Sequence, residues 1–163
     1  MAIAARWIRT VPAHEEEFRA THAALAFAQP ARASPIVLWR QGSERKEFAF
    51  VVPRIHAPGR AARWPAWMLS PAAATCRYFG LPVYLAKGGL WLHGRLLACG
   101  EVETRGECLV AACSLCISFP VERHVEELFR ARVEAQYDWQ FETSWPTPDE
   151  ARSIAGMVGE LAA

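Results

Sequence analysis

The segment from Cys108 to Phe119 constrains the fold more than any other part of the sequence, because its residues alternate in size. One set of alternate residues is mostly large: Leu109, Ala111, Cys113, Leu115, Ile117 and Phe119. The other set is mostly small: Cys108, Val110, Ala112, Ser114, Cys116 and Ser118. Successive side chains of a β-strand point to opposite faces of its sheet. We therefore expect a strand whose large face is covered by helices and whose small face floors a hollow.

Four segments carry the signals of helices. Residues 121–137 place Val121, Val125, Leu128, Phe129 and Val133 on one apolar stripe, which suits the layer over the large face. A helix over 14–30 begins with acidic residues, and His22 lies on its inward face. A short helix over 70–79 has Ser70 as its expected N-cap. The last helix begins at Thr147, where Glu150 can close a capping box.

The remaining ordered segments are short and rich in β-forming residues. Residues 36–39 and 47–52 predict a hairpin of half-buried strands, and residues 83–86 and 90–92 predict two further strand pieces. His93-Gly94 is typical of a tight hairpin turn. The prolines and glycine between Pro53 and Trp67 indicate an irregular surface loop.

These elements predict an α+β fold with a central mixed β-sheet flanked by helices, built of roughly five to seven strands and three to four helices. The length of 163 residues and the apolar content of 52% are sufficient for one domain spanning residues 1–163.

Composition excludes several classes of protein. With 18 basic and 17 acidic residues spread along the chain, no basic stripe is available for nucleic acid. No apolar run approaches the roughly 20 residues that cross a membrane, and no secretory leader is evident, so we expect a cytoplasmic protein. The five cysteines lie within apolar segments, which indicates reduced core residues.

Candidate metal and nucleophile motifs are weak. Cys113 and Cys116 have C-x-x-C spacing, but a strand places the two sulfurs on opposite faces, which favours a core role over a redox or metal site. The histidines form no pair at ligand spacing, so no metal site is predicted. His22 is the histidine to examine, because its helical position directs it inward.

The charged residues leave both functional and structural interpretations open. Glu101 and Glu103 face the same side of a strand, as paired catalytic carboxylates do, but the solvent end of a hairpin explains them more simply. The only lysines are Lys46, expected to be solvated in a hairpin loop, and Lys87. Lys87 precedes two glycines, where backbone can approach a ligand, although a charged turn is the simpler reading.

Three aromatic residues, Trp139, Phe141 and Trp145, lie in an otherwise polar connection between two predicted helices. We expect them to anchor a loop on the core, and an exposed aromatic patch would indicate a ligand or partner instead.

The stretch from Leu90 to Glu103, Leu-Trp-Leu-His-Gly-Arg-Leu-Leu-Ala-Cys-Gly-Glu-Val-Glu, resembles the strand, hairpin and strand at the active site of biotin and lipoate protein ligases. That family has there an apolar strand, a turn ending in glycine, a basic residue, a lysine, an apolar pair and a glycine. The strand at 108–119 and the helix after Pro120 follow in similar order. Residues 6–9, 18–25 and 35–39 resemble the opening strand, helix and strand of a lipoate ligase. The resemblance implies the fold of that family's catalytic core.

The chain departs from the family at several positions that carry chemistry. The catalytic lysine falls on Leu96, directly after Arg95. Gly89 stands where the family usually has a polar residue, and His22 stands where it has an aspartate. Cys99 lies near the position of a glycine that the family has after the lysine. The arginine- and glycine-rich segment that wraps the acyl-adenylate has no evident counterpart. A leaving phosphate would therefore lack its usual lysine.

The resemblance implies a protein that attaches or transfers lipoate, octanoate or biotin to a lysine of a lipoyl- or biotinyl-carrier domain. ATP with magnesium and lipoate or biotin are implied as cofactors where the family activity is retained. Lys87 and Arg95 would neutralise phosphate or carbonyl charge. The substrate-binding candidates are Gly88, Gly89, His22, Gly94, Ser114 and Cys116. The alternative is a catalytically degenerate relative that acts as a ligand-binding or protein-interaction accessory subunit.

Overall fold

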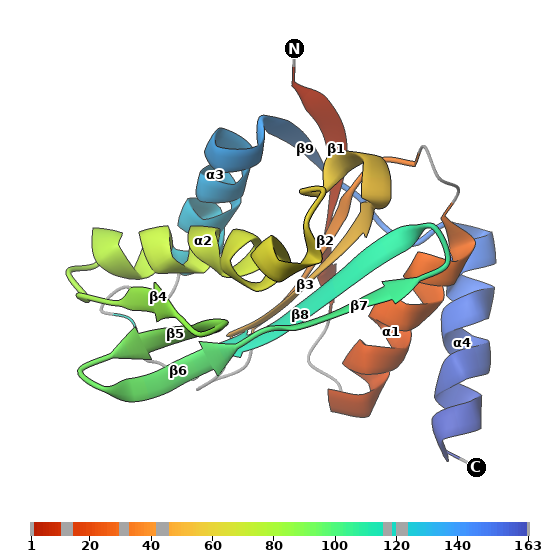
Figure 1. Ribbon diagram of the computed structural model, residues 1–163. Helices are drawn as coiled ribbons and strands as arrows, with labels where there is room; N and C mark the ends of the chain where they lie inside the picture. Colours follow the sequence, from red (N-terminus) through yellow and green to blue (C-terminus); the bar gives the residue numbers. More distant parts are fainter. Residues whose placement is uncertain are drawn as a thin grey trace.

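The computed structural model describes residues 2–10, 15–29, 33–41, 46–115, 119 and 124–162. Within these residues, six strands form a mixed sheet at the centre of the molecule (Figure 1). Their order across the sheet is β7 (Glu101–Arg105), β8 (Cys108–Leu115), β3 (Lys46–Pro53), β2 (Ile36–Gln41), β1 (Ile3–Thr10) and β9 (Trp139–Thr143). β1 is parallel to both β2 and β9, and the other neighbours are antiparallel. The predicted α+β class with a central mixed sheet is confirmed.

Helices cover both faces of this sheet (Figure 1). α1 (Glu15–Ala28) and α4 (Pro148–Ala162) pack on one face. α2 (Trp64–Tyr78) and α3 (Val125–Tyr137) pack on the other. A smaller antiparallel sheet of β4 (Tyr84–Ala86), β5 (Gly89–Leu92) and β6 (Arg95–Cys99) lies next to α2. The helices expected over 14–30, 121–137 and from Thr147 onward are confirmed within the described residues.

The alternation in β8 separates two hydrophobic cores, as its sequence predicts. Ala111, Cys113 and Leu115 belong to the core beneath α2 and α3. Cys108 and Val110 belong to the core beneath α1. One strand therefore supplies the large side chains to one layer of helices and the small ones to the other.

The β2–β3 hairpin is present, but its strands are buried on both faces rather than one. All eight residues of β3 are buried, because helices cover each side of this central strand. The expectation that Lys46 is solvated in a loop is wrong: Lys46 is the first residue of β3 and is 1% exposed. Next to it, the Glu47 carboxylate is 2.7 Å from the Arg40 guanidinium.

α2 begins at Trp64, not at Ser70 as predicted, so the last residues of the expected loop belong to the helix. Pro65 occupies the first turn, where a missing N–H costs nothing. Pro71 lies inside the helix and cannot donate to the carbonyl of Trp67, four residues earlier. The Tyr137 hydroxyl of α3 donates to that carbonyl instead. The end of the helix before Gly80 is as predicted, and Gly80 has a positive φ of 83°.

Substituting Tyr137 by phenylalanine is expected to lower the free energy of unfolding by about 1–3 kcal/mol, because the Trp67 carbonyl is then buried without a donor. Adding Pro71→Ala restores a backbone N–H that can donate to this carbonyl, so the double variant should recover most of the loss. Urea unfolding of the single and double variants measures both effects. A double variant as unstable as Tyr137→Phe would contradict this account.

The segment from Trp139 to Thr143 is a strand, β9, and not the loop that was expected. It lies at the edge of the sheet parallel to β1, with Trp139 and Phe141 buried. The expectation that these aromatics anchor the segment on the core is confirmed for both. Trp145, beyond the strand, is 72% exposed.

Candidate functional site

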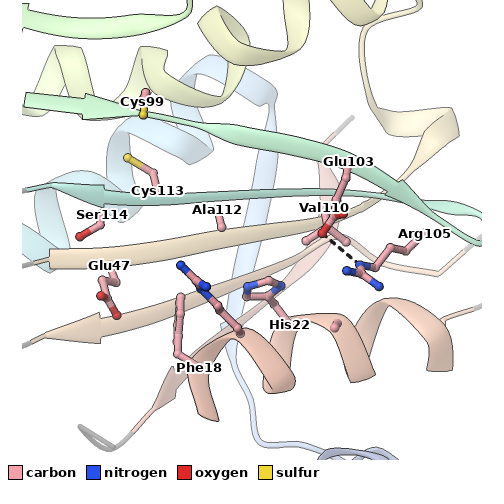
Figure 2. A pocket seen from close by; sticks show the side chains of 12 residues that line it. Phe18, His22, Glu47, Cys99, Glu103, Arg105, Val110, Ala112, Cys113 and Ser114 are labelled. Atoms are coloured by element: carbon pink, nitrogen blue, oxygen red, sulfur yellow. Dashed lines mark hydrogen bonds and ion pairs between the residues drawn. The ribbon is translucent and has the colours of Figure 1, made fainter. Parts of the chain in front are cut away.

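A cavity of about 430 Å³ lies between α1 and the β7–β8–β3 side of the large sheet (Figure 2). Its lining residues are Phe18, Arg19, His22, Ala23, Glu47, Cys99, Glu103, Arg105, Val110, Ala112, Cys113 and Ser114. The small face of β8 (Val110, Ala112 and Ser114) supplies its floor, so the hollow that the sequence predicts on this face is present. A cavity of this volume suits a small organic ligand.

His22 is a buried ionisable group of the cavity wall. The residue is 7% exposed, and its ring meets the Phe18 ring edge to face at 5.7 Å between centroids. Burial lowers the pKa of His22 from 6.5 to about 4, so the imidazole is neutral at physiological pH. Its Nδ1 atom is buried and has no hydrogen-bond partner in the described part of the chain.

Ser114 contributes a second unsatisfied polar atom. Its Oγ is buried and also lacks a hydrogen-bond partner among the described residues. Buried polar groups are nearly always hydrogen-bonded, so two unsatisfied atoms make this wall unusual. Both atoms have almost no accessible surface, so they lie behind the surface of the cavity rather than at it.

The charged side chains of the wall are already engaged. Arg105 Nε lies 3.0 Å from Glu103 Oε1, a contact drawn in Figure 2. Glu47 lies against Arg40, which approaches from the neighbouring strand. Arg19 also interacts within the protein. The cavity is therefore polar but close to neutral.

The structure brings together only part of the predicted site. His22 and Ser114 line the cavity, whereas Lys87, Arg95 and the three candidate glycines (Gly88, Gly89 and Gly94) belong to the small sheet and do not line it. Cys116 lies outside the described residues.

Both turns of the small sheet are tight hairpin turns, as predicted for His93-Gly94, and the charged turn at Lys87 has the same geometry. Lys87 and Gly88 have φ values of 51° and 70°, and His93 and Gly94 have φ values of 49° and 80°. Two successive positive φ values are typical of the tight hairpin turn that joins antiparallel strands. Lys87 and Arg95 are both exposed, at or beside these turns.

Leu96, where the resemblance puts the catalytic lysine, is 45% exposed on the small sheet. It pairs with Trp91, and a Cβ added to Gly89 would lie 2.6 Å from its Cδ1. Gly89 and Trp91 are two residues apart on β5 and therefore point to the same face. Because they pair with Cys99 and Leu96, Leu96 shares a face with the cavity residue Cys99. Arg95 pairs with Leu92 and therefore lies on the opposite face. It does not replace the lysine from that position.

The four charged lining residues were not among the predicted site residues: Arg19, Glu47, Glu103 and Arg105. Arg19 is three residues before His22 on α1, which is the spacing of neighbours on one helix face. Glu103 and Arg105 are two apart on β7, so they share a side of the strand. These local signals were available, but only the tertiary structure places them around one cavity.

Cys99 corrects another expectation, because it is exposed rather than buried in the core. Cys76, Cys108 and Cys113 are buried free thiols, as predicted. No group of three or more His, Cys, Asp or Glu side chains is arranged to hold a metal in the described part of the chain. None of its described helices combines the length and apolar character needed to cross a membrane.

Comparison with known proteins reveals the fold but no close relative. No protein-family model and no curated protein sequence matches the chain. A bi-partite lipoate protein ligase from Thermoplasma acidophilum, solved with its E2 lipoyl domain, superposes with a TM-score of 0.80 at 8% identity, over 97% of this chain and 93% of that one. A lipoate-protein ligase A bound with ATP gives 0.80 at 8% identity, over 97% and 95%. The biotin protein ligase from Aquifex aeolicus gives 0.58 at 10% identity, over 99% and 77%.

The chain therefore has the fold of the biotin and lipoate protein ligases, as the resemblance implies. At this level of identity the likeness defines the fold alone, and the activity has to be argued from the site.

The nucleotide that this fold implies does not fit the residues present. The side chain at the lysine position is Leu96, which offers no charge to a phosphate, and Arg95 lies on the other face of its sheet. We therefore derive no step that uses ATP.

Proposed function

We propose that this chain is a protein of the biotin and lipoate ligase type that binds a lipoyl, octanoyl or biotinyl group in the cavity beneath α1. The cavity is a partly open hollow of about 430 Å³ floored by small side chains of β8, in a fold shared with a lipoate protein ligase and a biotin protein ligase. The cavity over the small side chains of β8 is the observation on which the proposal rests, because its volume suits an acyl group of this kind. A lipoyl- or biotinyl-carrier domain is the proposed partner, by analogy with the ligase solved with its lipoyl domain.

Filling the cavity tests where the ligand binds. Ala112 is on the cavity floor, and Ala112→Leu should weaken binding of lipoyl, octanoyl and biotinyl compounds at least tenfold by occupying their space. Isothermal titration calorimetry measures the affinity. Ala135→Leu, on the exposed side of α3, is the matched control and should bind as the native chain does. Failure of all these compounds to bind the native chain would refute the proposal.

Transfer to a carrier is the second candidate function, favoured by the exposure of Lys87 and Arg95 on the small sheet, where a partner can reach them. Purified protein is incubated with ATP, magnesium and lipoate or biotin while pyrophosphate release is followed. Turnover that disappears in Lys87→Ala or Arg95→Ala would support an enzyme. Binding without pyrophosphate release would support an accessory, ligand-binding role.

A further inference from the structure

The expectation of evenly spread charge is wrong for the middle of the chain. No Asp or Glu occurs between Glu47 and Glu101, so all 17 acidic residues lie outside this stretch. Six basic residues lie within it: Arg54, Arg60, Arg63, Arg77, Lys87 and Arg95. All six are exposed, and none forms an ion pair within the described part of the chain. The stretch contains α2 and the small sheet, which therefore form the cationic part of the molecule.

The same stretch exposes apolar side chains. Among the described residues, four of the five exposed large apolar side chains belong to it: Ile55, Tyr78, Tyr84 and Leu96. Tyr84 and Leu96 are 46% and 45% exposed and lie on the two outer strands of the small sheet. Both pair with Trp91 of the middle strand. The side chains of Tyr84, Trp91 and Leu96 therefore form one row across one face of this sheet.

The row lies on the face of the small sheet that points away from the core. Leu90, next to Trp91 in β5, points the other way, pairs with Ala98 and is buried in the core that contains α2. The Trp91 ring is fixed on its own face, because its Nε1 donates to the Ala86 carbonyl at 2.9 Å. An aromatic ring that is already ordered loses little conformational freedom when a partner binds.

Basic residues flank this row at both ends of the small sheet (Figure 1). Lys87 occupies the turn at one end, and its neighbour Gly88 lies next to the first turn of α2, which Arg63 precedes. Arg95 follows the turn at the other end, and Arg77 Nε donates at 3.2 Å to the backbone just before β4. An aromatic and apolar centre with a charged surround rich in arginine is typical of a protein–protein interface.

The charges around the row indicate the kind of partner. Since no acidic residue accompanies the cations, an acidic surface would be attracted to the whole face. A second copy of the chain in a two-fold contact would bring a face of the same charge, so like charges oppose self-association. A nucleic acid needs cations along a continuous track of phosphates, whereas here the apolar row separates the basic groups. An acidic protein domain satisfies both the charge and the apolar row.

We propose that the row of Tyr84, Trp91 and Leu96, with the basic residues that flank it, is a docking surface for an acidic protein domain. Leu96 shares its face with Cys99, which lines the cavity, so a domain docked on this row stands beside the cavity. That the domain is the lipoyl- or biotinyl-carrier rests on the proposed function. Leu96 then contacts the partner from the position where the family has its lysine.

Calorimetry with an apo lipoyl domain and an apo biotinyl domain, each of net negative charge, tests the docking surface on the full chain. Tyr84→Ser combined with Leu96→Ser should weaken binding of the preferred domain by about tenfold or more. Both side chains are exposed, so the melting temperature should change little. Trp145→Ala is the matched control, because Trp145 is 72% exposed but lies outside the cationic stretch. Unchanged binding by the double variant, or equal weakening by the control, would overturn the inference.

The association rate tests the role of charge. Arg63→Glu combined with Arg77→Glu should lower the rate about fivefold in about 50 mM salt, and the difference should shrink in about 500 mM salt because ions screen exposed charges. These two residues leave Lys87 and Arg95, the candidates for transfer, unchanged. Arg152→Glu on α4, where the side chain is 75% exposed, is the control. Biolayer interferometry measures the rates. Equal rates for the native chain and the double variant would contradict docking of an acidic surface.

The alternative occupants are outcomes of the same experiment. Single-stranded RNA, vesicles containing phosphatidylserine and sedimentation of the chain alone test nucleic acid, membrane and a second copy. Tighter binding of RNA or vesicles than of the domains, or a dimer that Tyr84→Ser with Leu96→Ser disrupts, would overturn the inference. So would failure of both domains to bind the native chain. Binding of a domain together with failure of every lipoyl, octanoyl and biotinyl compound to bind would support the docking surface and refute the proposed function.

Discussion

Replacing Phe129 by alanine is expected to lower the free energy of unfolding by about 3–5 kcal/mol. Phe129 is 2% exposed and lies at the centre of an aromatic cluster. Its ring centroid is 4.6 Å from that of Phe48, 5.2 Å from that of Trp39 and 6.1 Å from that of Trp7. Three strands and α3 meet at this side chain, so they cannot close over the cavity that its removal leaves.

Urea unfolding followed by circular dichroism measures the loss. Ile55→Ala is the control, because Ile55 is 64% exposed and its truncation should change the stability by less than about 0.5 kcal/mol. A loss below about 1.5 kcal/mol for Phe129→Ala would mean that the aromatic cluster does not hold α3 on the sheet.

The second large effect is expected at Glu150, which joins α4 to the rest of the molecule. Its carboxylate accepts hydrogen bonds from Arg6 of β1 at 3.0 and 2.9 Å and from the Gln29 side chain. It also closes the predicted capping box: Thr147 N donates to Glu150 Oε1 at 2.8 Å, and Glu150 N donates to Thr147 Oγ1 at 3.2 Å. Glu150→Ala should cost about 2–4 kcal/mol, because it leaves the half-buried Arg6 guanidinium without a carboxylate, bonded to Ser144 Oγ and the Trp145 carbonyl.

The contribution of Glu150 should depend on pH. Burial by itself raises the pKa of Glu150, but hydrogen bonds from Arg6 and from the Thr147 backbone outweigh it and hold the pKa below its ordinary value of 4.5. A carboxyl with a lowered pKa stabilises the fold at pH values above 4.5, and this stabilisation is lost as the pH falls through the folded-state pKa.

Glu150→Gln is the matched control for the charge, because glutamine also forms a capping box. The difference in unfolding free energy between the native chain and Glu150→Gln should be largest near pH 7 and should shrink toward pH 3. A difference that does not change with pH would show that the charge of Glu150 contributes little.

The positions of the cavity and the small sheet separate two roles that the sequence suggested for one site. His22 and Ser114 line the cavity beneath α1, where the proposed function places the acyl group, while Lys87 and Arg95 lie at or beside exposed turns of another sheet. Variants of the cavity floor and variants of the small sheet therefore report on ligand binding and on transfer separately.

Local patterns in the sequence determined several elements of this protein. The alternation of β8, the capping box at Thr147 and Glu150, and the turns at Gly88 and Gly94 depend on neighbours within a few residues, and all are present. The inward direction of His22 follows from helical spacing alone. Such features can be predicted from the sequence because they depend on residue periodicity and local backbone geometry rather than on long-range contacts.

The tertiary structure decided the rest. Lys46 and the half-buried hairpin were misjudged because only packing reveals that both faces of β3 are covered. The Trp67 carbonyl of α2 accepts its hydrogen bond from Tyr137, which is distant in the sequence. The edge strand β9 depends on pairing with β1. The cavity likewise collects side chains from α1, β3, β6, β7 and β8, and no local pattern records that these segments converge.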